Sequence, residues 1–320
     1  MAATEQDNSL PLSKEETRRM KGRAPSGKPT AELAGLEDKA PPEKVIRLLD
    51  RAAMRAADAP AALEARVPKW VGTSFAAASP TAPPPPVVTR HGDKLDPLVI
   101  VPPRDDRQPY SATTYPWICV CRITRPDGAQ GSGVLIGPRH VLTASHVVQW
   151  NTTAAEKIEV NFAGSNALAT AFTQTAYAYT KITGGVSYST VDEDYACITL
   201  NQRLGDRFGW LGTKEYDSGW DGDNVWTTFG YPGGVARPNF PHVQSAFSLD
   251  EDAWDYGSGR AMTTTADASK GQSGSPIFAW WPDNGVYAVA VMSAVGGGEN
   301  WCSGGSDLNR IVKHARTVDP

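Results

Sequence analysis

Hydrophobic and polar positions follow different patterns in the two parts of this 320-residue chain. Between Pro42 and Pro60, apolar residues recur at helical spacing, which predicts an amphipathic helix near residues 43–59 with a shorter continuation through 61–66. From residue 98 onward, short apolar runs alternate with turn residues, as strands do. A last apolar stripe over 306–315 predicts a C-terminal helix.

The second part contains many predicted strands and no helix between them. The strands are expected at 117–123, 133–136, 141–142, 157–162, 168–174, 195–200, 224–230, 243–248, 259–265, 276–281 and 286–293. The Gly137-Pro138 turn joins the second and third of them into a hairpin. Short strands in succession predict an all-β barrel or sandwich, and the residues from 98 onward are numerous enough for two small barrels that share one cleft.

Composition places a domain boundary near residue 97. Of the 25 prolines, 13 lie in residues 1–97, whereas 25 of the 30 glycines lie beyond. Residues 1–42 are polar and charged, which predicts disorder, and the proline-rich stretch 76–90 predicts an extended linker. The first 97 residues are therefore expected to be a pro-region or linker-like segment, partly helical and partly disordered, before a domain over 98–320.

Charge and hydropathy exclude several classes of partner. The net charge is -4 without any block of like charge, so we expect neither nucleic acid nor an anionic membrane as a partner. No segment approaches the roughly 18 apolar residues that span a bilayer, and the N-terminus has no apolar run of signal-peptide length. We expect a monomer without cofactor or metal.

The four cysteines are too few for a disulfide scaffold. Cys119 and Cys121 are two apart on a predicted strand, which puts their side chains on one face, and we expect both to be free. Cys197 lies in an apolar strand and is expected in the core. Cys302 lies in a predicted Gly/Ser loop, and the cysteine spacing suits no common zinc pattern.

Three separated motifs contain the residue types of a nucleophilic acyl-transfer site. Thr143-Ala144-Ser145-His146 comes first, Asp194 precedes an apolar strand, and Gly271-Gln272-Ser273-Gly274-Ser275-Pro276 forms a glycine turn. A serine hydroxyl needs a base within reach, and the base needs a partner that fixes its tautomer. We therefore expect Ser273 as nucleophile, His146 as general base and Asp194 as orienting acid.

The glycine turn also suggests where charge would be stabilised. Gly271 and Gly274 allow a sharp turn in which backbone N–H groups converge, so we expect the amides of Gly271 and Ser273 to form an oxyanion hole. Asp192 and Glu193 compete with Asp194 for the role of orienting acid, and we expect both to be solvated. The other four histidines are interpreted as surface or packing residues: His91, His140, His242 and His314.

These motifs resemble those of the chymotrypsin-like (trypsin-like) serine proteases, particularly the branch with bacterial glutamyl endopeptidases. The resemblance covers roughly residues 98–316 and rests on TASHVV (143–148), DYACITL (194–200), GYPGG (230–234) and GQSGSP (271–276). It implies two six-stranded antiparallel β-barrels with a C-terminal helix, an active site between the barrels, and a polypeptide substrate. It also implies secretion, and a zymogen whose first 97 residues are removed near residues 99–103.

Two departures from the family pattern concern activation. No cysteine follows His146, so the disulfide common there in animal enzymes is absent. Gln272 stands where those enzymes have the aspartate that traps a new N-terminus. An ion-pair switch of that kind is therefore not expected, and any maturation would act by unblocking the cleft.

The resemblance also places a substrate pocket, for which the expected residues are Asp267, Ala268, Ser293, Ala294, Val295 and Gly296. Glutamyl-specific relatives have a histidine in the strand over 291–296, and this chain has none, so a glutamate in the pocket would be costly. If Asp267 points inward, a basic side chain is favoured. If it pairs with Lys270 or faces solvent, small or apolar side chains are favoured, and we prefer this second interpretation.

Two other functions remain open. An esterase of the α/β-hydrolase kind would use Ser273 with a later acid, Asp283 or Asp307, and His314, although the chain lacks the second glycine of the Gly-x-Ser-x-Gly motif. A non-catalytic binding module on a protease fold is the second alternative, since fold does not guarantee chemistry.

Overall fold

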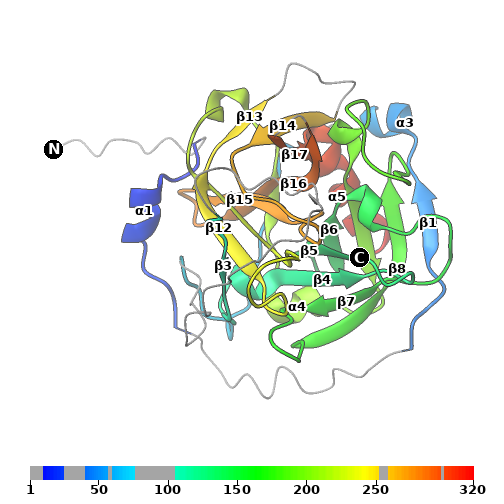
Figure 1. The fold of residues 1–320 in the computed structure, drawn as a ribbon, viewed down its shortest axis with the longest axis horizontal. Coiled ribbons are helices and arrows are strands. Elements are labelled where there is room, and N and C mark those ends of the chain that lie inside the picture. The colour runs from blue at the N-terminus through cyan, green and yellow to red at the C-terminus, as the bar shows by residue number, and fades with distance from the viewer. Residues whose placement is uncertain (1–9, 25–39, 57–59, 76–104, 252–258, 297–298) are drawn as a thin grey trace, which may run out of the picture.

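The computed structural model describes residues 10–24, 40–56, 60–75, 105–251, 259–296 and 299–320. Two β-sheets pack together, and helix α5 (Ser306–Val318) lies against the first of them (Figure 1). The predicted linker at 76–90 and the predicted processing site near 99–103 lie outside the described residues.

The first sheet closes into a six-stranded barrel. Its strand order is β1-β8-β7-β4-β5-β6-β9, and a further pairing between β8 and β9 closes it. The bounds are β1 Val45–Leu48, β4 Val120–Thr124, β5 Gln130–Gly137, β6 His140–Thr143, β7 Lys157–Val160, β8 Ala169–Ala178 and β9 Ala196–Leu200. The β5–β6 hairpin confirms the Gly137-Pro138 prediction. The closed barrel is antiparallel throughout, and β1 is added outside it in parallel to β8.

The second sheet is a half-barrel rather than the closed six-stranded barrel that the resemblance implied. Its order is β13-β14-β17-β16-β15-β11-β12-β3, and among the described strands no pairing joins β13 to β3. Strand β10 pairs with β16, and β2 adds to β10. The bounds are β2 Ala62–Leu63, β3 Gln108–Pro109, β10 Gly212–Lys214, β11 Trp226–Gly230, β12 His242–Phe247, β13 Leu249–Glu251, β14 Arg260–Thr264, β15 Pro276–Trp280, β16 Val286–Gly296 and β17 Glu299–Gly304.

Among the described residues, the helices are short apart from α5. The α-helices are α1 Lys14–Arg19, α3 Arg51–Arg55, α4 Leu204–Phe208 and α5 Ser306–Val318, and the 3-10 turns are η1 Trp117–Cys119, η2 Ser145–Val147, η3 Val191–Glu193 and η4 Ser218–Trp220. The predicted C-terminal stripe is confirmed, because Leu308, Ile311, Val312 and Ala315 of α5 are all fully buried. They anchor the helix on the first barrel, against β6, β8 and β9.

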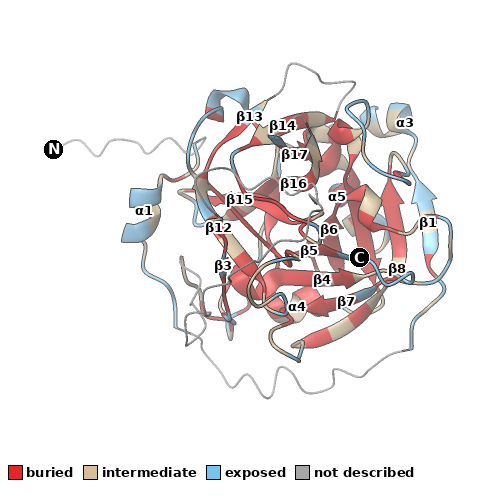
Figure 2. Ribbon diagram, viewed as in Figure 1, coloured by how far each residue is buried: buried red, intermediate tan, exposed pale blue. Residues whose placement is uncertain are grey.

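The barrel strands are buried, whereas α1 and most of β1 are exposed (Figure 2). One hydrophobic cluster fills the first barrel and continues to Trp117, Phe278 and Trp280. A second, aromatic cluster with Tyr216, Trp220, Trp226 and Trp281 fills the far side of the half-barrel. The tryptophans of this cluster thus serve packing, as the contacts between their rings show.

The prediction of a helix near 43–59 is wrong. Residues 45–48 form β1, the helix α3 is only five residues long, and residues 62–63 of the predicted continuation form β2. The cause is tertiary: β1 pairs with residues 175–178 of β8, where a backbone edge would otherwise be left without partners. Asp50 then starts the short helix by accepting a hydrogen bond from the Ala53 N–H at 3.1 Å.

The prediction that residues 1–42 are disordered is wrong for the part that the structure describes. Ser13 and Glu16 form a capping box that starts α1. Just before it, the Leu12 N–H donates to the Trp280 carbonyl at 2.7 Å and the Leu12 side chain is buried. A short capped helix and one buried leucine are therefore enough to attach this segment to the half-barrel.

All four cysteines are buried and free, as predicted for Cys119, Cys121 and Cys197. Burial raises the pKa of the Cys197 thiol to about 12. The prediction that Cys302 lies in a loop is wrong, because it lies in the middle of β17 between β14 and β16. The hydrogen bonds to β14 and β16 hold this segment as a strand, although its glycines and serines locally favour a loop.

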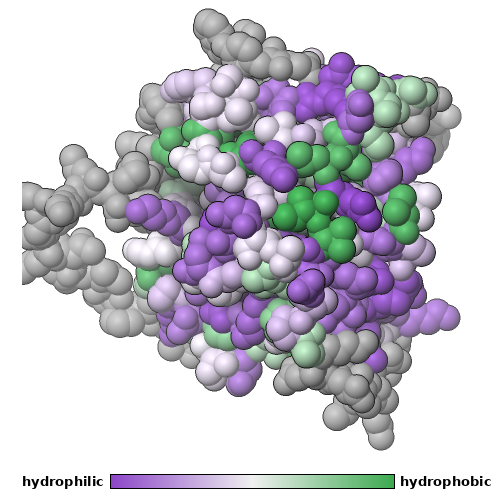
Figure 3. Space-filling model, turned by 90° about the vertical axis from the view of Figure 1, so that its right-hand side faces the viewer, coloured by the Kyte–Doolittle hydropathy of each residue, from purple (hydrophilic) through white to green (hydrophobic). Residues whose placement is uncertain are grey.

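The face formed by β1 and the end of α5 carries exposed hydrophobic side chains within a mostly hydrophilic surface (Figure 3). Val45 and Leu48 of β1 and Val318 of α5 are 42%, 50% and 55% exposed. They border a shallow hollow that Tyr177 and His314 also line. None of the described helices is both long and apolar enough to span a bilayer.

Candidate active site

His146 lies in η2, directly after β6, and its ring is bonded to Asp194. The distance from His146 Nδ1 to Asp194 Oδ2 is 2.6 Å, and the His146 backbone N–H donates to Asp194 Oδ1 at 2.9 Å. The Asp194 side chain is fully buried, while the His146 side chain is 23% exposed. A buried carboxylate thus holds both the ring and the backbone of a partly exposed imidazole.

Asp194 follows η3 and precedes β9, as the sequence predicted. A further side chain, Ser293 on β16, donates from Oγ to Asp194 Oδ2 at 2.6 Å. Ser293 was expected only as a pocket residue, and its role as a donor to Asp194 was missed. No sequence signal could have found it, since the pair joins the two sheets across 99 positions.

The prediction that Asp192 and Glu193 are solvated is wrong. Asp192 is fully buried, and Glu193 accepts hydrogen bonds from Arg51 and Thr180. A Cβ placed on Gly259 would lie 1.9 Å from the Asp192 carbonyl, so the half-barrel covers this loop closely. The loop that carries Asp194 is therefore held by the N-terminal segment on one side and by the second sheet on the other.

Ser273 lies in the turn before β15, and its turn packs against the strand that leads to His146. Gly274 has φ +82°, and a Cβ there would lie 2.2 Å from Thr143 Oγ1 and 2.8 Å from the Ala144 nitrogen. Only glycine allows this combination of backbone angle and close approach. The turn that contains Ser273 therefore packs directly against Thr143 and Ala144, which precede His146 by three and two positions.

Strand β5 connects the two motifs. The Ser132 N–H donates to the Ser273 carbonyl at 2.8 Å, and the Ser132 carbonyl accepts from Thr143 Oγ1 at 2.7 Å. A Cβ on Gly131 would lie 2.6 Å from Val147 Cγ1 and 3.3 Å from the Ser273 carbonyl oxygen. The residue after His146 and the carbonyl of Ser273 thus meet at one glycine, at the junction of the two sheets.

Two backbone N–H groups of the turn are left for a ligand. Gln272, Gly274 and Ser275 donate to the carbonyls of Ser269, Met292 and Gln272 at 3.0, 2.8 and 2.8 Å. Among the described residues, the N–H groups of Gly271 and Ser273 have no acceptor. Gly271 has φ +94° and lies against the Tyr231 carbonyl, which fixes the direction of the turn.

A cavity of about 190 Å³ opens beside Ser273. It is lined by Ala268, Ser269, Lys270, Ser273, Met292, Ser293, Ala294 and Val295. The structure thus brings together four of the six expected pocket residues, whereas Asp267 does not line the cavity and the surroundings of Gly296 lie outside what the structure describes. Four of these eight residues are apolar, three are serines and one is a lysine.

Asp267 neither lines the cavity nor faces solvent. It is 1% exposed, and its Oδ2 accepts from the Asp106 N–H at 2.9 Å and from Gln244 Nε2 at 3.3 Å. The contact with Asp106 spans 161 positions, so local sequence could not reveal it.

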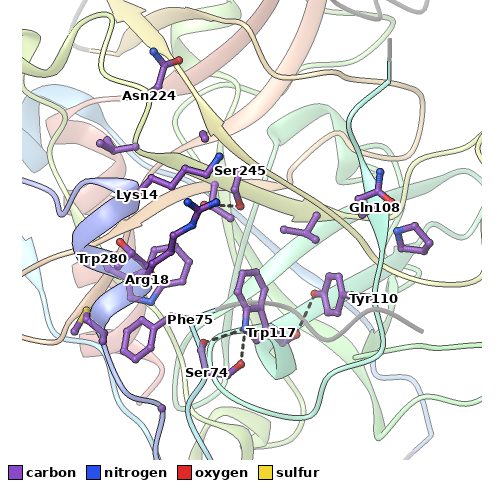
Figure 4. A pocket seen from close by; sticks show the side chains of 18 residues that line it. Lys14, Arg18, Ser74, Phe75, Gln108, Tyr110, Trp117, Asn224, Ser245 and Trp280 are labelled. Atoms are coloured by element: carbon purple, nitrogen blue, oxygen red, sulfur yellow. Dashed lines mark hydrogen bonds between the residues drawn. The ribbon is translucent and has the colours of Figure 1, made fainter. Parts of the chain in front are cut away.

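A larger cavity lies elsewhere in the described part of the chain. It measures about 600 Å³ and is bordered by Lys14 and Arg18 of α1 and by the rings of Phe75, Trp117 and Trp280 (Figure 4). None of the expected site residues lines it.

His314 does not approach the nucleophile turn. Its ring stacks edge-on against Tyr177, with centroids 5.5 Å apart, in the hollow beside β1. The described residues include no group of three or more His, Cys, Asp and Glu side chains that could hold a metal ion.

Comparisons with known proteins agree with the observed fold. Residues 131–287 match the trypsin-like peptidase domain. A search of curated proteins gave no match. Among solved structures, a Glu endopeptidase in complex with MPD is similar in fold, with a TM-score of 0.56 and 19% identity over 68% of this chain and all of that one.

Two further structures match with TM-scores below 0.5. The protease Anisep from Arthrobacter nicotinovorans has a TM-score of 0.47 and 20% identity over 62% of this chain and 92% of that one. The thermostable serine protease AL20 from an extremophilic microorganism has a TM-score of 0.48 and 12% identity over 62% of this chain and 96% of that one. The chain thus has a chymotrypsin-like double-barrel fold, and over residues 131–287 it is similar to the trypsin-like peptidase domain.

Proposed function

We propose that this protein is a serine endopeptidase that cleaves polypeptides through an acyl-enzyme. The single observation that carries the proposal is the buried Asp194 carboxylate bonded to His146 Nδ1 at 2.6 Å, at the junction where the Ser273 turn packs. With Nδ1 bonded to the carboxylate, Nε2 is the ring nitrogen that accepts the Ser273 proton and later passes it to the leaving amine. Asp194 stabilises the imidazolium that forms.

The oxyanion of the tetrahedral intermediate would be held by the N–H groups of Gly271 and Ser273. Their lack of an intrachain acceptor within the described residues supports this role, because an oxyanion hole needs donors that nothing else occupies. Loss of one such donor typically costs about 10²–10³ in rate.

We further propose that the residue before the cleaved bond is small or apolar. The cavity beside Ser273 is walled by Ala268, Met292, Ala294 and Val295. Asp267, the carboxylate that would favour a basic side chain, is instead held by Asp106 and Gln244. A peptide library should therefore show cleavage after small or apolar residues, and a profile dominated by glutamate, lysine or arginine would contradict this.

Labelling with a fluorophosphonate probe tests the nucleophile and the base. The intact protein should be labelled, Ser273→Ala should not be, and His146→Ala should react at least about 10³-fold more slowly. His314→Ala is the matched control, because an esterase built on His314 would lose labelling there instead. Failure of the wild-type chain to react would favour the non-catalytic alternative.

A further inference from the structure

Arg107 is a buried cation next to the nucleophile turn. It lies one residue before β3, and its side chain is 2% exposed. Its Nη1 donates to Ser269 Oγ at 2.7 Å and to Gln272 Oε1, and its Nε and Nη2 donate to the Asp105 carboxylate at 2.9 and 2.7 Å. The guanidinium therefore joins Asp105 to the two side chains that precede Ser273.

Gln272 closes the turn from the other side. Its backbone N–H donates to the Ser269 carbonyl at 3.0 Å, and its Oε1 accepts from the Ser269 N–H at 3.0 Å as well as from Arg107. Gln272 itself is 1% exposed. One amide oxygen thus connects both ends of the Ser269–Gln272 turn to the guanidinium, and the next residue is Ser273.

The charges of this cluster balance without any chain end. Gln272 is neutral, so the counter-charge of Arg107 is Asp105, two residues earlier. Burial alone would raise the pKa of Asp105, but the hydrogen bonds and charge of Arg107 hold it below its ordinary value. A buried guanidinium that has both an ion-pair partner and several hydrogen bonds is held in one position.

We propose that Arg107 is a positioning residue that holds the Ser269–Ser273 turn, and with it the N–H groups of Gly271 and Ser273, in working geometry within the intact chain. This inference rests on the proposed function. It assigns to an internal arginine the task for which some members of the family need a newly cut N-terminus. The uncut 320-residue protein is then competent without any cleavage before Arg107.

Arg107→Ala, Gln272→Leu and the double variant test the proposal in the full-length chain, with intact mass confirming that the protein is uncut. Each single variant should lower the rate of fluorophosphonate labelling about 10²-fold, because misplacing catalytic groups by about 1 Å has that effect. The double variant should lose little more, since both remove one shared contact. On a peptide substrate, kcat should fall while KM stays nearly constant. Arg107→Lys keeps the positive charge but loses the planar set of N–H donors, so its labelling rate should lie between those of the wild type and Arg107→Ala.

Arg122→Ala is the matched control, because it breaks a comparably buried pair with Glu159 between β4 and β7, away from the turn. Its labelling rate should equal that of the wild type. Equal rates in Arg107→Ala and wild type, or equal losses in Arg107→Ala and Arg122→Ala, would overturn the proposal.

Amide hydrogen exchange separates this proposal from the proposed function. Arg107→Ala should speed exchange in the peptide over 269–275 at least about tenfold and leave the peptide over 143–148 unchanged, whether or not the protein reacts with the probe. Unchanged exchange over 269–275 would overturn the positioning role. An inert wild type with the expected exchange would overturn only the endopeptidase.

Discussion

Strand pairing assembles both the N-terminal segment and the barrels. The sequence pattern predicts the strands of the barrels but not the strand of the segment. Strands β6 and β9 are buried along their whole length, so their apolar runs report the pairing. Three of the four residues of strand β1 are exposed, and its pairing depends on β8, which lies 130 positions away. A strand that completes an open edge is specified by its partner rather than by its own pattern.

The segment is nevertheless bound to the first barrel by a buried ion pair. Lys44 Nζ donates to Glu156 Oε1 and to the Gln149 carbonyl, the latter at 2.9 Å, and both charged side chains are fully buried. Glu156 Oε1 also accepts from the Gln149 N–H at 3.0 Å. The segment therefore supplies the counter-charge of a buried carboxylate in the first barrel.

Lys44→Met gives the largest expected effect. It leaves Glu156 buried without its counter-charge, which should lower the free energy of unfolding by about 3–5 kcal/mol. Chemical denaturation of the full-length protein measures the loss. Lys44→Met combined with Glu156→Leu is the control and should recover most of the stability, because the uncompensated charge is gone. A loss below about 1 kcal/mol in Lys44→Met would mean that the segment is only loosely attached.

Sequence reasoning succeeded where the signal is local and failed where it depends on distant residues. The barrel strands, the C-terminal helix and the His146–Asp194 pairing follow from periodicity and from motif chemistry. Strand β1, the contact from Asp106 to Asp267 and the donor Ser293 each join positions more than 90 residues apart. The local sequence pattern around these residues does not indicate their distant partners. Only the folded structure shows which buried charges and strand edges they pair with.

Lowering the pH should reduce the stability of the first barrel through a histidine that lies outside the N-terminal segment. His140 on β6 is fully buried, and this burial, with the nearby Arg316 and Arg139 charges, lowers its pKa from 6.5 to about 4. The unfolded chain then binds more protons than the native one as the pH falls from about 6.5 to 4, so stability is present above pH 6.5 and lost over that window. The difference corresponds to about 3 kcal/mol.

Urea unfolding of wild type and His140→Leu between pH 4 and 7 measures this contribution. The slope of unfolding free energy against pH should be smaller in the variant, because it has no buried imidazole to protonate. Parallel curves would show that other groups cause the acid response. His242, whose pKa burial also lowers, is the first of these to replace.

The smallest effects should distinguish two ion pairs made by arginines of the segment, one to the barrel domain and one within α1. Arg51 pairs with Glu193, beside Asp194, and lies 3.5 Å from Asp307 Oδ2, with side-chain exposures of 21%, 16% and 0%. Arg51→Met should cost about 1–2 kcal/mol, because partly buried charges lose a hydrogen-bonded partner.

Arg19 pairs with Glu15 on α1, where the two side chains are 73% and 76% exposed. Arg19→Met should change the unfolding free energy by less than about 0.5 kcal/mol, since water screens exposed pairs. Thermal unfolding of the two variants at equal salt makes the comparison. Equal effects would show that α1 is as firmly integrated as the strand next to the first barrel, whereas the expected difference ties the stability of the segment to the loop that orients His146.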